Sequence, residues 1–506
     1  MLTRTSPISH HYLQNLALIL LSLFFLPLDT FILAISYALR RLLPTTAVPQ
    51  PQTLPPTRRK TILVTGVGMT KGLTLARLFH LAGHRVIGAD FEPGNPPALV
   101  CSRVSTALAR FYRLTPPGAQ EDSGPYISSL VDVIQRERVS LWVSCSGVAS
   151  AISDAEAKEV VEKRTACRAI QFDVRQTETL HEKDRFIGRC RDLGLLVPET
   201  ITVTSAEEIE KVLRERAGQG REFIMKSIAL DDASRADMTL LPRPTEAETR
   251  KHVQGIRISA SRPWILQEFI RGPEFCTHAL VVKGEVKAFV ACPSAELLMH
   301  YKAIPADSPL SRAMLAFTRR FADAGGRSFT GHLSFDFLVK EEDLGKKRPQ
   351  EIRLYPIECN PRAHTAVALF SHEVKMVDGY LSLLGKSREE TNGYQHTNGV
   401  NEEDGPVTPK RPYRYYWVGH DVVTLVLLPL SQLLRGKGGR GEFTEGFQVF
   451  LGHLLSWKDG TYEIWDPLPW WWLYHVYWPT QFLNSILTGR KWSRMNVSTT
   501  KMFGVE

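Results

Sequence analysis

The sequence has few cysteines, and none of the spacings that disulfide-bonded or zinc-binding domains use. Its seven cysteines are odd in number, are scattered through 506 residues and form no Cys-x-x-Cys pair. Secreted disulfide frameworks use an even set of cysteines, and structural zinc sites commonly use closely spaced pairs. The cysteines therefore indicate reduced thiols in a cytosolic setting, and they argue against a disulfide framework and a zinc site.

Long runs of one charge and internal repeats are also missing. The formal charge is +9, but basic clusters such as 58–60 and 346–348 are short and carry no interleaved aromatic residues. Nucleic-acid binding needs a concentrated basic patch or stripe, so no nucleic-acid partner is predicted. A positive charge that is spread thinly fits a protein that lies beside anionic lipid.

One strongly apolar run is present, residues 13–38, with Asp29 as its only charge. Its many leucine, isoleucine and phenylalanine side chains outweigh the roughly 3 kcal/mol that one central charge costs a membrane helix. Arg40 and Arg41 follow in place of a small-residue cleavage site, so residues 1–42 are predicted to be a retained membrane segment. The basic flank places the catalytic body on the cytosolic side. A proline and an aspartate near the middle leave a spanning helix and a shallow hairpin both open.

Changes in composition divide the rest of the chain. Residues 43–60 read as a proline-rich linker, and strands alternating with helices over 61–175 predict a doubly wound α/β domain. Residues 176–385 have the mixed pattern of an α+β domain. Residues 386–412 lack periodicity and predict a disordered linker. Residues 413–506 are rich in aromatic residues, and within them the dense tryptophan and tyrosine stretch 465–478 favours membrane contact and a folded aromatic core or protein interface equally.

A glycine-rich turn follows the first strand of the α/β region. Gly66, Gly68 and Gly72 give the spacing GxGxxxG, and the next predicted strand ends in Asp90. A dinucleotide site would use the turn for phosphates and the aspartate for a ribose, but its fingerprint is GxGxxG. No tyrosine is followed four residues later by a lysine, as a short-chain dehydrogenase requires. We therefore favour a structural or substrate-facing turn.

Oxygen ligands lie on two predicted strands that follow one another in the chain. The first strand carries Asp336, and the second carries Glu358 and Asn360 on one face because alternate strand side chains share a face. Two carboxylates and an amide oxygen suit Mg²⁺ that also binds phosphate oxygens. Arg362 lies on the same face and suits a phosphoryl group in transfer. The pattern of the first strand alone favours an edge hairpin with a solvent-exposed polar face. The two strands together favour a metal site.

In chain order these residues belong to a set that resembles the ATP-grasp superfamily across residues 176–385. The resemblance implies ATP held between two α+β lobes, preceded by a pre-ATP-grasp α/β domain, with Mg²⁺ or Mn²⁺ as the metal. It implies metal ligation by Asp336, Glu358 and Asn360, and a catalytic role for Arg362. The nucleotide contacts that it implies are Lys183, Lys226, Gln267, Glu268, Phe269, Ile270 and Glu274.

A more specific resemblance covers nearly the whole chain. The strings GVGMTKGLTLARLFHLAGHRVIGAD, WILQEFIRGPEFCTH and IECNPRAHTA are similar to those of the ATP-grasp enzymes of mycosporine biosynthesis. This resemblance implies a ligase that joins an amino acid amine, typically glycine, to 4-deoxygadusol. ATP phosphorylates the enol oxygen, the amine adds, and phosphate leaves. Lys226 is expected to act in catalysis as well as in nucleotide binding.

Several assignments are less specific. Arg235 lies in a polar stretch, 229–239, that reads as a flap, and it is expected to close over the triphosphate or to bind a carboxylate. His278, His364 and Thr365 either face the acceptor or fill structural roles. Two other functions stay open, a carboxylate–amine ligase that uses an acyl phosphate and a membrane-tethered nucleotide-binding scaffold without turnover.

Overall fold

The computed structural model describes most of the chain. The described residues are 6–43, 49–118, 122–145, 147, 150–216, 221–227, 238–294, 299–385, 405–410 and 413–504. Arg235, most of the predicted flap and residues 386–404 of the predicted linker lie outside them.

A five-stranded parallel sheet forms the N-terminal half of the body, in the order β3-β2-β1-β4-β5. Its central strand β1 is buried on both faces, which a parallel sheet requires because helices cover both sides. The predicted alternation of strands and helices is therefore present. The elements are β1 (Thr61–Thr65), α2 (Thr70–Leu81), β2 (Arg85–Asp90), β3 (Arg110–Arg113), α3 (Gly124–Glu137), β4 (Leu141–Ser144), α4 (Ala151–Arg164) and β5 (Arg168–Ile170).

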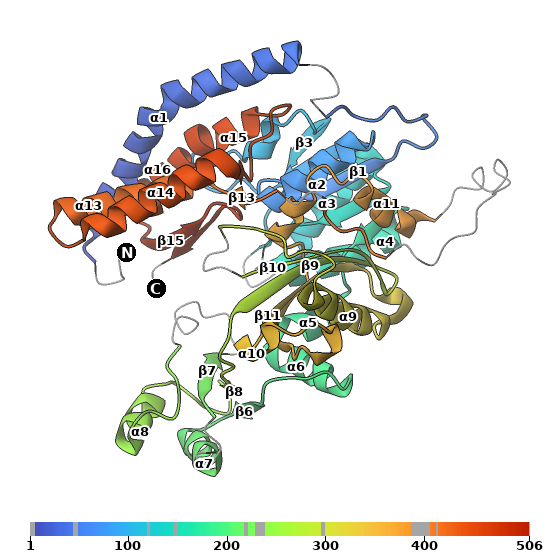
Figure 1. Ribbon diagram of the computed structural model, residues 1–506. Coiled ribbons are helices and arrows are strands. Elements are labelled where there is room, and N and C mark those ends of the chain that lie inside the picture. The colour runs from blue at the N-terminus through green and yellow to red at the C-terminus, as the bar shows by residue number, and fades with distance from the viewer. Residues whose placement is uncertain are drawn as a thin grey trace.

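Two antiparallel sheets follow, as the α+β pattern predicts. The small sheet has the order β6-β8-β7 and carries α7 and α8, at the end of the molecule opposite α1 in Figure 1. Its elements, with the two helices that precede it, are α5 (Val174–His181), α6 (Lys183–Asp192), β6 (Thr200–Val203), α7 (Ala206–Arg216), β7 (Phe223–Ser227), α8 (Glu246–Gln254) and β8 (Trp264–Glu268).

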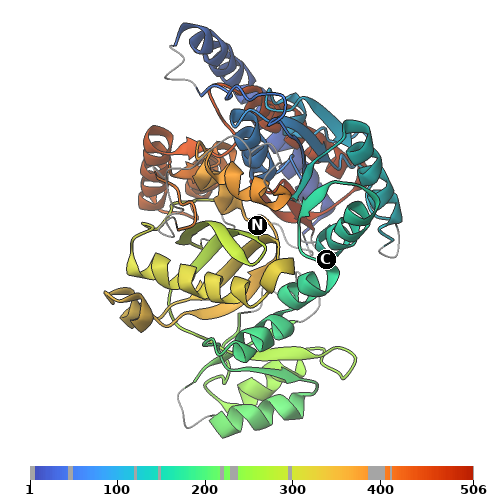
Figure 2. The ribbon, with the colours of Figure 1, turned by 90° about the vertical axis from the view of Figure 1, so that its right-hand side faces the viewer.

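The larger antiparallel sheet has the order β10-β9-β11-β12 and lies between the small sheet and the parallel sheet (Figure 2). A phenylalanine cluster on α9 and β11 packs one of its faces. Its elements are β9 (Glu274–Val282), β10 (Glu285–Pro293), α9 (Pro309–Asp323), β11 (Gly331–Leu338), α10 (Glu341–Leu344), β12 (Tyr355–Asn360), η9 (Thr365–Phe370) and α11 (Met376–Leu381).

The C-terminal region forms a layer of helices beside the long helix α1 (Ile8–Leu42) (Figure 1). Within the described residues, α1 is the one helix long and apolar enough to cross a membrane. The layer consists of α12 (Val418–Asp421), the π-helical turn η11 (Val422–Leu427), α13 (Leu428–Leu434), α14 (Arg440–Ser456), α15 (Leu468–Trp472), the π-helical turn η12 (Leu473–Tyr477) and α16 (Trp478–Thr488). Two short sheets complete it, β13 (Tyr415–Tyr416) with β14 (Lys458–Asp459), and β15 (Trp492–Asn496) with β16 (Lys501–Gly504).

The structure decides between the two interpretations of the aromatic tail. Trp465, Trp470 and Trp478 are buried in the protein, and the indole of Trp472 donates a hydrogen bond to the carbonyl of Leu99 in the α/β region. These rings therefore belong to a folded core, because their apolar surfaces are covered by the rest of the chain.

The prediction of a disordered linker over 386–412 is wrong for its described part, residues 405–410. Val407 exchanges backbone hydrogen bonds with Lys287 and Phe289 on β10, and the backbone N–H of Lys410 donates to Glu373. The segment pairs with the sheet through one isolated bridge, between Val407 and Ala288. A single bridge imposes no alternation on the sequence, so a local pattern could not predict it.

Candidate functional site

The predicted metal ligands meet on two paired strands. Asp336 on β11 lies opposite Glu358 on β12, and Ser334 lies opposite Asn360. The side-chain amide of Asn360 donates to Asp336 at 3.1 Å, and Arg362 donates to the amide oxygen of Asn360 at 2.7 Å. The antiparallel register therefore places both carboxylates, the amide and the guanidinium in one continuous group.

The electrostatics of this group fit a divalent cation. Burial raises the pKa of Asp336 well above its ordinary value, and the nearby carboxylates of Glu358 and Glu274 raise it further. Repulsion among acidic groups is relieved when a cation binds between them, and carboxylate and amide oxygens are the donors that Mg²⁺ prefers. Asp336, Glu358 and Asn360 are therefore the residues that would hold the metal.

Two lysines approach the same acidic group from different elements. Lys183, at the start of α6, forms an ion pair with Glu358 at 3.5 Å. Lys226 on β7 donates to the side-chain oxygen of Gln267 on β8 at 2.7 Å. Burial and the neighbouring charge of Lys183 lower the pKa of Lys226 to about 8. Helix α6 and the small sheet thus supply one cation each to the acidic group on the large sheet, which gives the charge distribution of a triphosphate–metal site.

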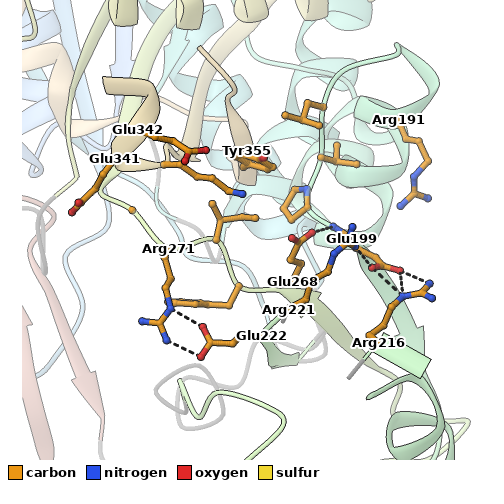
Figure 3. Close-up of a pocket in the computed structure, with 17 residues that line it drawn as sticks. Arg191, Glu199, Arg216, Arg221, Glu222, Glu268, Arg271, Glu341, Glu342 and Tyr355 are labelled. Carbon is orange, nitrogen blue, oxygen red and sulfur yellow. Dashed lines mark hydrogen bonds and ion pairs between the residues drawn. The ribbon is translucent and has the colours of Figure 1, made fainter. Parts of the chain in front are cut away.

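The predicted hinge, Glu268 to Ile270, lies at the edge of a cavity of about 1300 Å³. Figure 3 shows that this cavity is lined by charged side chains, with Arg271 paired to Glu222 and both Arg216 and Arg221 paired to Glu199. The four residues of the phosphate side do not line it, namely Lys183, Lys226, Asp336 and Glu358. The hinge therefore borders open space, and an ATP whose adenine lay there would extend beyond this cavity to the phosphate-side group.

Lys71 is a candidate that the sequence analysis did not single out. It lies in the glycine-rich turn at the start of α2, and its side chain is buried. Burial lowers its pKa to about 7, and the positive charge of Arg362 lowers it further in the same direction. A lysine in a glycine turn looks like an ordinary helix-start residue in sequence. Only the packing of α2 against η9, which follows Arg362 in the chain, brings its charge near that of Arg362.

The glycine turn itself is packed against the protein's own chain. Gly66 has φ +68°, and a Cβ at Gly72 would lie 2.3 Å from the carbonyl oxygen of Gly66. Asp90 accepts hydrogen bonds from the backbone N–H groups of Gly68 and Phe91. The aspartate that a dinucleotide site would use for a ribose therefore holds the turn in place, which supports the structural or substrate-facing interpretation.

The histidines near Arg362 are buried and have different partners. The ring of His364 accepts a hydrogen bond from the backbone of Ala366 and caps η9, so this residue has a structural role. His278 packs against His332 and accepts from the backbone N–H of His364. Burial lowers the pKa values of His332 and His364 to about 3, which keeps both rings neutral at physiological pH. Thr365 contacts Ser498 of the C-terminal tail.

A second group of potential metal ligands lies away from this cleft. Asp421 on α12 is fully buried, and its two oxygens are hydrogen-bonded by His300 at 2.9 Å and His453 at 2.6 Å. These contacts satisfy the buried carboxylate and tie α12 and α14 to the body.

Comparisons with known proteins give only distant similarities. No protein-family model matches the chain, and no curated protein matches it. Among solved structures, an L-amino acid ligase from Bacillus licheniformis is similar at 14% identity and a TM-score of 0.43, covering 66% of this chain and 76% of that one.

Two further similarities are at the same level. An N5-carboxyaminoimidazole ribonucleotide synthetase in complex with ADP gives 12% identity and a TM-score of 0.48 over 74% of this chain and 86% of that one. A biotin carboxylase from Campylobacter jejuni in complex with β-γ-ATP gives 14% identity and a TM-score of 0.46, over 65% of this chain and 71% of that one. The functional conclusion therefore depends on the residues of the site.

The lowered pKa of Lys226 predicts a specific pH dependence. If Lys226 contacts the phosphates of ATP, as the family resemblance implies, it does so as the ammonium, and that form is lost as the pH rises through about 8. We expect the KM for ATP to rise between pH 7 and pH 9, and to rise less steeply in Lys226→Arg because arginine stays charged. Steady-state kinetics at saturating acceptor measure this. If the KM for ATP rose equally steeply with pH in the parent and in Lys226→Arg, a phosphate contact by Lys226 would be contradicted. Lys211→Arg, an exposed position on α7, is the control.

Proposed function

We propose that this protein is an ATP-grasp ligase that uses ATP and Mg²⁺ to form a C–N bond. The observation that carries the proposal is the single group formed by Asp336, Glu358, Asn360 and Arg362, with Lys183 and Lys226 beside it. Phosphoryl transfer depends mainly on positioning and charge neutralisation, and this group provides ligands for a cation together with three fixed positive charges.

The residues divide the work of phosphoryl transfer. Lys183 and Lys226 bind phosphate oxygens of ATP, and the hinge at Glu268 to Ile270 holds the adenine. Mg²⁺, when bound by Asp336, Glu358 and Asn360, neutralises charge on the phosphates. Arg362 stabilises the phosphoryl group as it leaves ADP, because a guanidinium matches phosphate oxygens in two-point hydrogen bonds.

The proposed acceptor is 4-deoxygadusol, and the proposed amine is glycine. The enol oxygen attacks the terminal phosphorus, and the bond to ADP breaks. The amine then adds to the carbon that carries the phosphate, and phosphate leaves with the C–O bonding pair, which gives an enaminone. Resemblance of the sequence to the enzymes of mycosporine biosynthesis supports this acceptor. Lys71 adds a second buried cation on the side of the α/β domain whose charge acts on Arg362, a feature that suits any anionic acceptor.

The proposal is tested by incubating the full chain with ATP, Mg²⁺, 4-deoxygadusol and glycine. We expect a new ultraviolet absorbance band that requires all four components, with one ADP and one phosphate released per product. Omitting ATP is the matched control. ADP release with amino acids alone, giving a dipeptide and no new band, would replace this reaction with the carboxylate–amine alternative. No ADP release with either acceptor would leave the nucleotide-binding scaffold as the better description.

We also propose that the protein is associated with a membrane through α1, with the catalytic body on the cytosolic side. The support is the long apolar helix Ile8–Leu42 and the two arginines in its last turn.

A further inference from the structure

Helix α1 contacts the protein along one of its faces. The side-chain oxygen of Asn15 accepts from the indole of Trp492 at 2.9 Å, Ser36 bonds Tyr462 at 2.7 Å, and Arg40 donates to the carbonyl of Trp465 at 3.0 Å. The helix is therefore attached over roughly 37 Å, at 1.5 Å per residue between Asn15 and Arg40. A helix attached in this way cannot be surrounded by lipid as a separate membrane span.

The opposite face of α1 is exposed and wholly apolar. Its residues recur at intervals of three, four or one, which keeps them on one side of the helix. The side chain of Phe24 is 74% exposed and that of Phe31 is 63% exposed. The exposed residues of this face are Leu13, Leu16, Leu20, Leu23, Phe24, Leu28, Phe31 and Ile35.

A second apolar face is formed by η11, α13 and α14. Leu434 is 79% exposed and Leu455 is 86% exposed, values that are unusual for leucine on a water-facing surface. Two cations, Arg435 and Lys437, lie in the connection between α13 and α14, and a third, Arg440, begins α14, whose first turn also carries Glu442. Cations at the ends of apolar helices reach lipid headgroups and favour anionic lipid.

A cavity of about 880 Å³ lies between α1 and these helices. Its volume is within the roughly 300–1,000 Å³ of ligand sites in proteins. Leu28 on α1, Leu427 on η11 and Leu454 on α14 line it and are also exposed, so the cavity borders the apolar faces. Inside, Asp29 is paired with His475 at 2.9 Å, and Ser22 bonds the same histidine, so these polar groups satisfy one another.

We propose that α1 and the segment from η11 to α14 lie together in one leaflet of a membrane, and that the cavity between them holds a hydrocarbon chain of a bilayer lipid. The occupant is lipid because the rim is exposed leucine and the neighbouring loop is cationic. The walls are mostly apolar, with Lys458, Asp459 and Glu463 as further charged residues of the lining. The inference rests on the proposed membrane association and is independent of the proposed ligase activity. Under this proposal α1 lies in the plane of one leaflet and does not cross the bilayer.

The test uses the purified full chain and vesicles of phosphatidylcholine and phosphatidylglycerol that carry a diazirine near the end of one acyl chain. After flotation and illumination, mass spectrometry locates the cross-links. We expect cross-links on exposed residues of both faces, such as Leu20 and Leu451, and on cavity residues, such as Leu21 and Val423. Cross-links on the exposed faces alone would overturn the proposal that the cavity holds a lipid chain. Absence of flotation would overturn the proposal that the apolar faces insert into a membrane.

Two cavity-filling variants make the test specific. Val423→Trp and Val426→Phe are expected to reduce cavity cross-links at least fivefold while those at exposed positions persist. Leu455→Trp, outside the cavity, is the matched control and should change neither. Unchanged cavity cross-links in both filling variants would contradict the proposal. Because flotation and cross-linking do not depend on turnover, a failure of the ligase proposal gives a different result, namely normal cross-links without ADP release.

Discussion

Replacing Asp336 with asparagine is expected to reduce ATP-dependent turnover by about 10²–10⁴-fold, since charge stabilisation by a bound metal is worth several kcal/mol and each 1.36 kcal/mol is tenfold in rate. The substitution keeps the shape of the side chain and removes its charge. Glu358→Gln should have an effect of similar size, because the two residues face each other across β11 and β12. ADP release at saturating Mg²⁺ measures both.

The control for this prediction is Glu342→Gln, which removes a carboxylate that pairs with Arg353 near the hinge cavity. It should keep nearly full activity, because an exposed ion pair contributes little. Burial raises the pKa of Asp336, so its substitution should leave the melting temperature unchanged or higher. Activity equal to the parent in Asp336→Asn and Glu358→Gln would contradict the metal assignment.

Lys71→Met is expected to lower the rate of ligation by at least about 10²-fold, the scale of losing one charged contact to a transition state, while ATP binding changes little. Lys71 lies in the α/β domain and its charge acts on Arg362, so we place it at the acceptor in the proposed reaction. The substitution should also stabilise the protein. The pKa of Lys71 is lowered to about 7 in the folded protein, so the folded state bears the cost of a buried charge below that pH.

The sign of the stability effect follows from proton binding. Between about pH 7 and the ordinary pKa of lysine the unfolded chain binds more protons at this position, so stability of the parent rises with pH across that window. The melting temperature of Lys71→Met should therefore exceed that of the parent most at pH 6, with the difference shrinking as the pH rises. Thermal unfolding at several pH values measures this.

The matched control is Lys158→Met, which removes another buried lysine of lowered pKa from the same domain. Lys158 donates to the carbonyl of Gln171, so its loss leaves that oxygen without this bond and should not impair ligation. Full ligation activity in Lys71→Met, or equal losses in both variants, would show that Lys71 has no specific role at the acceptor.

Local patterns predicted most of the residues on the metal side of the site. Asp336, Glu358 and Asn360 were predictable because a strand places alternate residues on one face, and two consecutive strands commonly pair. The lysines Lys183 and Lys226 followed from their order in the chain and from family resemblance. The roles of these five residues stay predictions. The structure places Asn360 and the two lysines around the acidic pair Asp336 and Glu358.

Other features were not accessible to such patterns. The charges of Lys71 and Arg362 act on each other only because α2 packs on η9, and these two residues are far apart in the chain. The aromatic tail reads equally as membrane contact or core, since a tryptophan-rich stretch has the same composition in both. For Trp465, Trp470 and Trp478 the burial of the rings in the protein decides for the core.

The sequence by itself determined the alternating α/β region, the mixed sheets after it, the oxygen ligands on adjacent strands and one long apolar helix. These features depend on periodicity and on neighbours along the chain, which the order of residues specifies directly. Tertiary structure alone decided the place of Lys71, the order of residues 405–410 and the attachment of α1 along its length. Each of these depends on contacts between distant segments, whose free energy comes from surfaces that exist only when the whole chain has folded.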